Sequence, residues 1–131
     1  MARRRTEMLT DVELELMKAL WTIKSGTVRD IMAALGEGQT RAYTSIATMM
    51  KILAKKGYVT AEQKDRTLTY APTIAKSAYE GRSLKNLSES LFGGTPTALV
   101  ARLVDDGELT DEMIREIKEI IDTRISRDDS S

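Results

Sequence analysis

The spacing of apolar and polar positions predicts a mostly helical chain with one β-hairpin in its first half. A first helix is expected over residues 11–22, because Thr10 and Glu13 have the spacing of a capping box. Apolar residues then recur at helical intervals, and Trp21, the single tryptophan, should be a large core side chain. The core face of this helix consists of Leu14, Met17, Leu20 and Trp21.

Two further helices separated by a glycine-rich turn come next. A short helix starts at Thr27, and residues 36–40 end it. A longer helix over residues 41–56 has neither Gly nor Pro and ends at Gly57, which is typical of a left-handed C-cap. Its apolar stripe consists of Tyr43, Ile46, Met50, Leu53 and Ala54. This order predicts a helix-turn-helix, which places its second helix in the major groove of DNA.

The longer helix also carries a polar stripe, made of Thr44, Thr48, Lys51 and Lys55. Hydroxyl groups near a helix start can reach base edges or phosphates, and lysines farther along can hold the DNA backbone. Such a stripe alone is more often an ordinary solvated surface. Its place on the second helix of a helix-turn-helix favours DNA contact, with Arg41 as a further phosphate-binding candidate.

The alternation of residues 58–70 predicts a β-hairpin whose tip carries Lys64 and Arg66. Beside a helix-turn-helix this hairpin is a wing, and its two cations would contact phosphates or the minor groove. By itself the tip would be an ordinary solvated turn.

Three short amphipathic helices are expected after Pro72, over residues 74–91, from Thr95-Pro96, and from Thr110. Their apolar stripes cannot all be buried on the small winged head, so we expect a second copy of the chain to cover them. Packing back onto the head is the alternative. The expected dimer interface consists of Leu84, Leu87, Leu91, Leu99, Leu103, Ile114, Ile117, Ile121 and Ile125.

These patterns predict four parts. They are a basic N-terminal arm (residues 1–8), a winged-helix DNA-binding domain (9–72), a helical dimerisation domain (73–126) and a disordered tail (127–131). The arm contains three consecutive arginines that can contact the DNA backbone or minor groove.

The formal net charge of zero conceals an asymmetry between the two halves. Residues 1–72 carry 12 Lys/Arg and 8 Asp/Glu, a net charge of +4, and residues 73–131 carry 8 and 12, a net charge of −4. A basic head and an acidic interaction segment are typical of a DNA-binding protein.

Several classes of chemistry are excluded by composition. The chain contains no Cys and no His, so disulfides, zinc fingers and soft-metal sites are excluded, and so are the commonest catalytic nucleophile and base. We expect no enzymatic activity, metal or cofactor. No apolar run is long enough for a membrane span and no secretory signal is evident, so a cytoplasmic location is expected.

The chain resembles the penicillinase-repressor (BlaI/MecI) family of bacterial transcriptional repressors along almost its whole length. The segments that carry the resemblance are LTDVELELMKALW (9–21), TVRDI (27–31), AYTSIAT (42–48), LAKKGYV (53–59), TYAP (69–72), LFGG (91–94) and LV (99–100). The resemblance implies a homodimer that binds a palindromic operator and represses a resistance or stress operon. It implies recognition-helix contacts by Thr44, Ser45, Ala47, Thr48 and Lys51.

The chain departs from the staphylococcal members of that family at two places. Those proteins have a basic residue at the position of Thr44 and an arginine at that of Ala47, so their operator sequence should not be carried over. An alanine would instead meet a thymine methyl group. Those repressors are also inactivated by a protease at an Asn-Phe bond; the matching bond here is Arg102–Leu103, which lacks that signature.

Two functions from different classes fit these patterns. The first is a dimeric DNA-binding repressor, whose partners are double-stranded DNA, a second copy and a regulatory protease. The second is a winged helix that binds another protein and not DNA, because fold alone does not settle function. The basic stripe favours the first, since a protein-docking surface would not require it.

Overall fold

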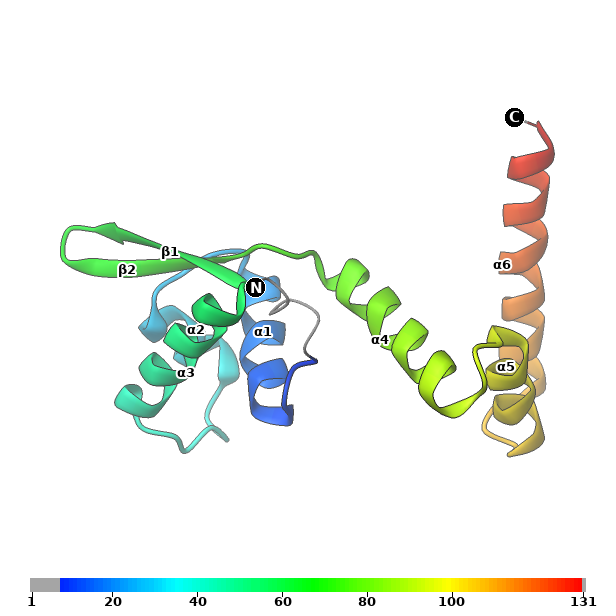
Figure 1. Cartoon of the computed structure of the whole chain (residues 1–131), viewed down its shortest axis with the longest axis horizontal. Coiled ribbons are helices and arrows are strands. Elements are labelled where there is room, and N and C mark those ends of the chain that lie inside the picture. Colours follow the sequence, from blue (N-terminus) through cyan, green and yellow to red (C-terminus); the bar gives the residue numbers. More distant parts are fainter. Residues whose placement is uncertain (1–7, 131) are drawn as a thin grey trace. The chain divides into compact units, whose positions relative to one another are not determined.

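The computed structural model describes residues 8–130, with the side chains of residues 128–130 left out of the description. The elements are α1 (Asp11–Ile23), α2 (Val28–Leu35), α3 (Tyr43–Lys56), β1 (Val59–Lys64), β2 (Thr67–Pro72), α4 (Lys76–Leu91), α5 (Pro96–Asp105) and α6 (Asp111–Ser130) (Figure 1). Over these residues the chain is mostly helical with one antiparallel hairpin, as the sequence predicts.

The chain divides into two compact units, of which the first ends at Ser83 and the second begins at Leu84. The boundary expected from sequence was at residues 72–73. The difference arises because the first turns of α4 pack with the winged helix. The hydroxyl of Tyr79 accepts a hydrogen bond from the Leu9 backbone N–H at 3.0 Å, and its ring lies 6.0 Å from those of Trp21 and Tyr58.

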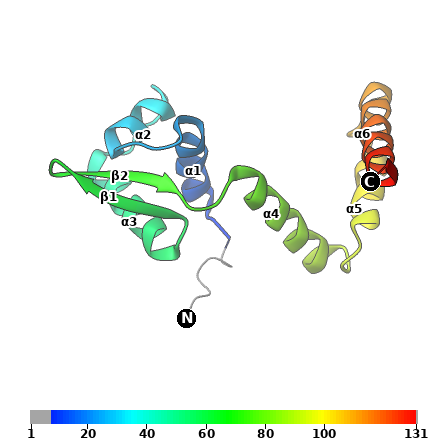
Figure 2. The same ribbon diagram turned by 90° about the horizontal axis from the view of Figure 1, so that it is seen from above.

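The first unit is a three-helix core with a hairpin beside it (Figure 2). Strand β1 contacts α3 and β2 contacts α1. The two strands pair in a register that sets Val59 opposite Pro72 and Lys64 opposite Thr67. Residues 65 and 66 have φ values of 48° and 70°, so they form the two-residue left-handed turn that matches the twist of a hairpin.

A short bridge joins this hairpin to the loop between α1 and α2. The Gly26 N–H donates to the Tyr70 carbonyl at 3.0 Å, and the Tyr70 N–H donates to the Gly26 carbonyl at 2.8 Å. This pairing holds the wing against the helices. The order of helices, the hairpin and the bridge together define a winged helix-turn-helix domain.

The core of this unit is formed by aliphatic side chains from all three helices and by two tyrosines. Burial of each large side chain contributes about 1.5–3 kcal/mol. The fully buried residues are Leu16, Met17, Leu20, Ile31, Ile46, Met50, Leu53, Tyr58 and Tyr70.

Two aromatic residues lie differently from the expectation. Trp21 is half-buried at the edge of the core, where its indole N–H donates to the Ile74 carbonyl at 2.9 Å, so it is not a central core side chain. Tyr43 was expected in the apolar stripe of α3 but is 44% exposed. It lies in the first turn of α3, where its ring contacts the exposed side chain of Arg29 and not the core.

Three of the predicted helix ends are confirmed, whereas α3 begins at Tyr43 and not at residue 41, because Ala42 has the extended backbone of an N-cap. Thr10 and Glu13 form a reciprocal capping box at the start of α1, and Thr27 and Asp30 form one at the start of α2. Gly57 ends α3 in the left-handed conformation, with φ 90° and ψ 10°.

The second unit contains the last part of α4 with α5 and α6. Helix α5 has no buried residue. Helix α6 runs to Ser130, so residues 127–130, expected in a disordered tail, are helical. The predicted N-terminal arm lies outside the described residues except for its last position. In the described part of the chain, no helix is long and apolar enough to cross a membrane.

Candidate nucleic-acid interface

The outward face of α3 carries the polar residues expected from sequence. Ile46, Met50 and Leu53 turn one side of the helix into the core and are fully buried. The residues on the other side are exposed, and they are Thr44, Ser45, Thr48, Lys51 and Lys55. Helix α3 contains no acidic residue, so this surface presents hydroxyl groups and ammonium groups without a carboxylate of its own helix among them.

The hydroxyl of Thr48 already uses its proton in a hydrogen bond within α3. It donates to the backbone carbonyl of Thr44 at 2.9 Å. Since a hydroxyl has one proton and two lone pairs, Thr48 can still accept a hydrogen bond. In a major groove the matching donors are the amino groups of adenine and cytosine.

The apolar part of this surface differs from the expectation at Ala47 and Ile52. Ala47 is half-buried against the core, so less of its methyl group is available to a base than the sequence suggests. Ile52 is 42% exposed and lies one turn after Thr48 on the outward side of α3. Sequence reasoning missed Ile52, although an isoleucine outside the apolar stripe was the available signal.

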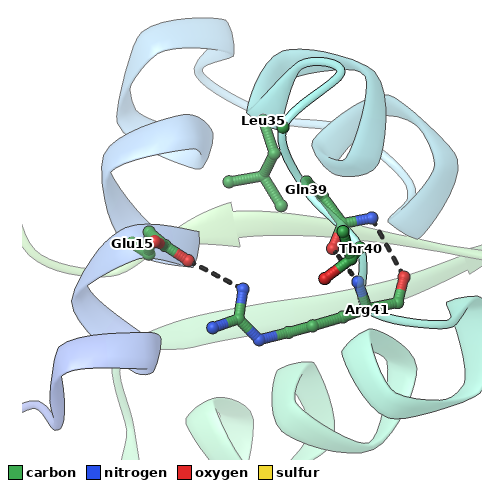
Figure 3. Close-up of a pocket in the computed structure, with 6 residues that line it drawn as sticks. Glu15, Leu35, Gln39, Thr40 and Arg41 are labelled. Carbon is green, nitrogen blue, oxygen red and sulfur yellow. Dashed lines mark hydrogen bonds and ion pairs between the residues drawn. The ribbon is translucent and has the colours of Figure 1, made fainter.

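Arg41 is held by its own domain (Figure 3). Its guanidinium group lies 2.9 Å from the Glu15 carboxylate of α1. The amide of Gln39 clamps its backbone, accepting from the Arg41 N–H at 2.5 Å and donating to its carbonyl at 2.9 Å. Arg41 therefore has a carboxylate partner, which the sequence did not reveal. The pair is exposed and contributes at most about 1 kcal/mol, so a phosphate group could replace Glu15.

A polar pocket of about 390 Å³ lies beside this ion pair. It is lined by Glu15, Leu35, Gly38, Gln39, Thr40 and Arg41 (Figure 3). The pocket lies between α1, the end of α2 and the turn that leads to α3.

The wing presents both predicted cations. Lys64 ends β1, Arg66 follows it in the turn, and both side chains are exposed. The ion pairs found between residues 8 and 130 involve neither residue. Their charges are therefore available to a polyanion.

A second ion pair that sequence did not reveal fixes the other end of α3. The Lys56 ammonium group lies 2.8 Å from the carboxylate of Glu13, which is buried in α1. Burial alone would raise the pKa of Glu13, but the hydrogen bonds and charge of Lys56 and the hydrogen bonds from Thr10 together lower it. This pair joins the last turn of α3 to α1, and the pair of Arg41 with Glu15 joins the segment just before α3 to the same helix. The two pairs together help to fix the orientation of the outward face of α3.

The residues expected at a dimer interface are largely uncovered within one chain. Leu84, Leu87, Leu91, Leu103, Ile121 and Ile125 are between 41% and 67% exposed, while Leu99, Ile114 and Ile117 are half-buried. Among the described residues, every exposed large hydrophobic side chain except Tyr43 and Ile52 belongs to the second unit.

The predicted cleavage bond lies within α5. Arg102 pairs with Asp106 one turn later, at 3.5 Å, and Leu103 is 41% exposed. No group of three or more His, Cys, Asp or Glu side chains in the described range could hold a metal ion.

The geometry thus describes a winged helix-turn-helix domain followed by a helical unit with an uncovered apolar surface. The chain belongs to the penicillinase repressor family, whose model matches residues 9–123.

Individual relatives match along most of the chain. The penicillinase repressor of Bacillus licheniformis is 26% identical over 124 residues, covering 95% of this chain and 97% of that protein. The transcriptional regulator BlaI of Mycobacterium tuberculosis is 30% identical over 99 residues, covering 74% of this chain and 72% of that protein. A solution structure of the DNA-binding domain of the repressor BlaI shares 32% identity and covers 54% of this chain and 87% of that one, with a TM-score of 0.48.

Proposed function

We propose that the protein is a transcriptional repressor that binds a palindromic operator in duplex DNA as a homodimer. Membership of the penicillinase repressor family supports repression through DNA binding. The observation that carries the proposal is the outward face of α3, where exposed hydroxyl groups precede exposed lysines on a helix without any acidic residue. A polyanionic duplex is the partner that this surface fits.

The two kinds of side chain have separate roles. Lys51, Lys55, Lys64 and Arg66 contact phosphates and supply most of the affinity, which is therefore sensitive to salt. Arg41 also contacts a phosphate once that group replaces the Glu15 carboxylate as its partner. The hydroxyl groups of Thr44, Ser45 and Thr48 contact base edges and supply sequence preference.

Dimerisation is supported by the apolar surface of the second unit. Burial of each of its large aliphatic side chains contributes about 1.5–3 kcal/mol, and together they offset an association cost of about 4–15 kcal/mol. A two-fold dimer of winged helices contacts two half-sites about 34–36 Å apart, so the operator has matching symmetry. Occupying a promoter in this way excludes RNA polymerase, and the family resemblance favours a resistance or stress operon as the target.

Release by a regulatory protease at Arg102–Leu103 is part of the same proposal. Cleavage there would detach α6 and the end of α5, and with them much of the exposed apolar surface. Because the bond lies in a helix, α5 would have to unwind locally before a protease could bind it in extended form.

Footprinting on the DNA upstream of the protein's own gene tests the proposal. We expect a protected, two-fold symmetric site that binds much more tightly than a random duplex of the same length. Equal binding to both duplexes would exclude sequence-specific repression. If no duplex changes the elution of the protein in size-exclusion chromatography, the winged helix would instead be a protein-interaction module.

A further inference from the structure

Arg29 and Tyr43 form a contact on the side of α3 that faces α2. Arg29 is the second residue of α2 and its side chain is exposed. Its guanidinium carbon lies 5.0 Å from the ring centroid of Tyr43, the first residue of α3. This distance is within the range of a cation–π interaction. The contact places a positive charge beside the first turn of α3.

The positive charge of Arg29 is not balanced by a carboxylate in the ion pairs found among the described residues, whereas that of Arg41 is. Glu15 balances Arg41 at 2.9 Å, whereas none of the ion pairs found over residues 8–130 includes Arg29. A cation–π contact with a ring orients a guanidinium group while its N–H donors stay available for hydrogen bonds. Arg29 is therefore held in place yet still able to donate hydrogen bonds to an anion.

The position of Arg29 complements the distribution of charge on α3 itself. The first cation of α3 is Lys51, in the second half of the helix. The polar side-chain groups of its first turn are all hydroxyl groups. Tyr43, Ala47 and Lys51 are four residues apart, so they follow one side of the helix over about 12 Å. Lys51 is the cation at the C-terminal end of this row, and Arg29 supplies one at the N-terminal end.

We propose that Arg29, oriented by the ring of Tyr43, binds a backbone phosphate of duplex DNA at the N-terminal end of α3. This inference rests on the proposed DNA-binding function. A phosphodiester offers two oxygens, which suit the paired N–H donors of a guanidinium group. Tyr43 acts as a positioning residue, because its ring and not its hydroxyl group holds Arg29.

Salt-dependent titrations of the full-length protein with the footprinted duplex and with a random duplex test this assignment. Arg29→Ala should weaken binding to both duplexes about 5- to 10-fold and lower the slope of log K against log salt by about 0.9. Tyr43→Leu should weaken binding to both while leaving most of the slope, because the charge stays but its orientation is lost. Tyr43→Phe, which keeps the ring, should match the wild type.

Two controls separate this inference from the proposed function. Lys18→Ala removes an exposed cation from α1 and should change nothing, and Lys51→Ala should lower the slope as Arg29→Ala does. If Arg29→Ala behaves like Lys18→Ala while Lys51→Ala weakens binding, the Arg29 assignment is wrong and the repressor proposal stands. If Tyr43→Phe weakens binding as much as Tyr43→Leu, the positioning role is wrong. If the wild type binds no duplex, both proposals fail.

Discussion

The ammonium group of Lys56, in the last turn of α3, lies 2.8 Å from the carboxylate of Glu13, in the first turn of α1. The same carboxylate accepts the Thr10 backbone N–H at 2.9 Å. One side chain therefore caps α1 and anchors the end of α3. The orientation of the candidate DNA-binding helix depends in part on a group that never faces DNA.

Replacing Lys56 with Met should destabilise the domain by about 1.5–3 kcal/mol, since a mostly buried carboxylate loses a charged hydrogen-bond partner. Thermal or urea unfolding at neutral pH measures this loss. Lys55→Met is the matched control, because Lys55 is exposed and next in sequence, and it should leave stability within about 0.5 kcal/mol of the wild type. Equal losses in the two variants would show that the ion pair contributes nothing.

Stability should also fall in acid because of Glu13. The pKa of Glu13 is lower in the folded protein than its ordinary value, despite the burial that opposes this. Ionisation of Glu13 therefore stabilises the folded state. This contribution to the free energy of unfolding is fully present above the ordinary pKa of a glutamate, roughly 4.3. The contribution is lost as the pH falls through the lowered pKa of Glu13 in the folded protein. A Glu13→Gln variant should be less stable than the wild type at pH 7, and unfolding curves should show this difference shrinking toward pH 3. A difference that does not depend on pH would contradict the assignment.

Removing the Thr48 hydroxyl should change sequence preference, because it weakens binding to the operator while leaving binding to a random duplex unchanged. Thr48→Val keeps the shape of the side chain but cannot accept a hydrogen bond from a base amino group. We expect a loss of about 1–3 kcal/mol in discrimination at one base pair of each half-site, with an unchanged salt slope. Competition binding with single-base operator variants measures it. Unchanged discrimination at every position would remove Thr48 from the interface.

A charge within the apolar surface of α6 should separate the proposed dimer. Ile121 is 50% exposed in one chain, and Ile121→Glu would place a carboxylate where the partner copy packs. Sedimentation should show a monomer that binds operator DNA at least about 100-fold more weakly, because the two heads no longer share an effective concentration. Thr123→Glu adds the same charge on the opposite side of α6 and should remain dimeric. If Ile121→Glu is also dimeric, this stripe is not the interface.

Local features of the fold could be predicted from sequence because they depend on neighbours along the chain. The capping box of Thr10 and Glu13, the left-handed Gly57 and the tight turn at Asp65 and Arg66 all follow from spacing within a few residues. The exposure of the polar stripe on α3 followed from helical periodicity in the same way.

Features that depend on how helices pack could not be predicted. The partners of Lys56 and Arg41 lie on α1, 43 and 26 residues away in sequence, and no local pattern indicates them. The half-burial of Ala47 and the exposure of Tyr43 likewise depend on how α3 packs against the rest of the domain. The boundary at Ser83 was missed because the contacts of Tyr79 with Trp21 and Tyr58 form only once the domain has folded.

The central claim is that two linked winged heads contact two half-sites on the same face of the duplex. Inserting five base pairs between the half-sites of the footprinted operator tests it most directly, because half a helical turn moves one half-site to the opposite face. Titration of the intact protein should show affinity falling to that of a single half-site, while a ten-base-pair insertion should restore part of it. Full affinity after the five-base-pair insertion would contradict the account.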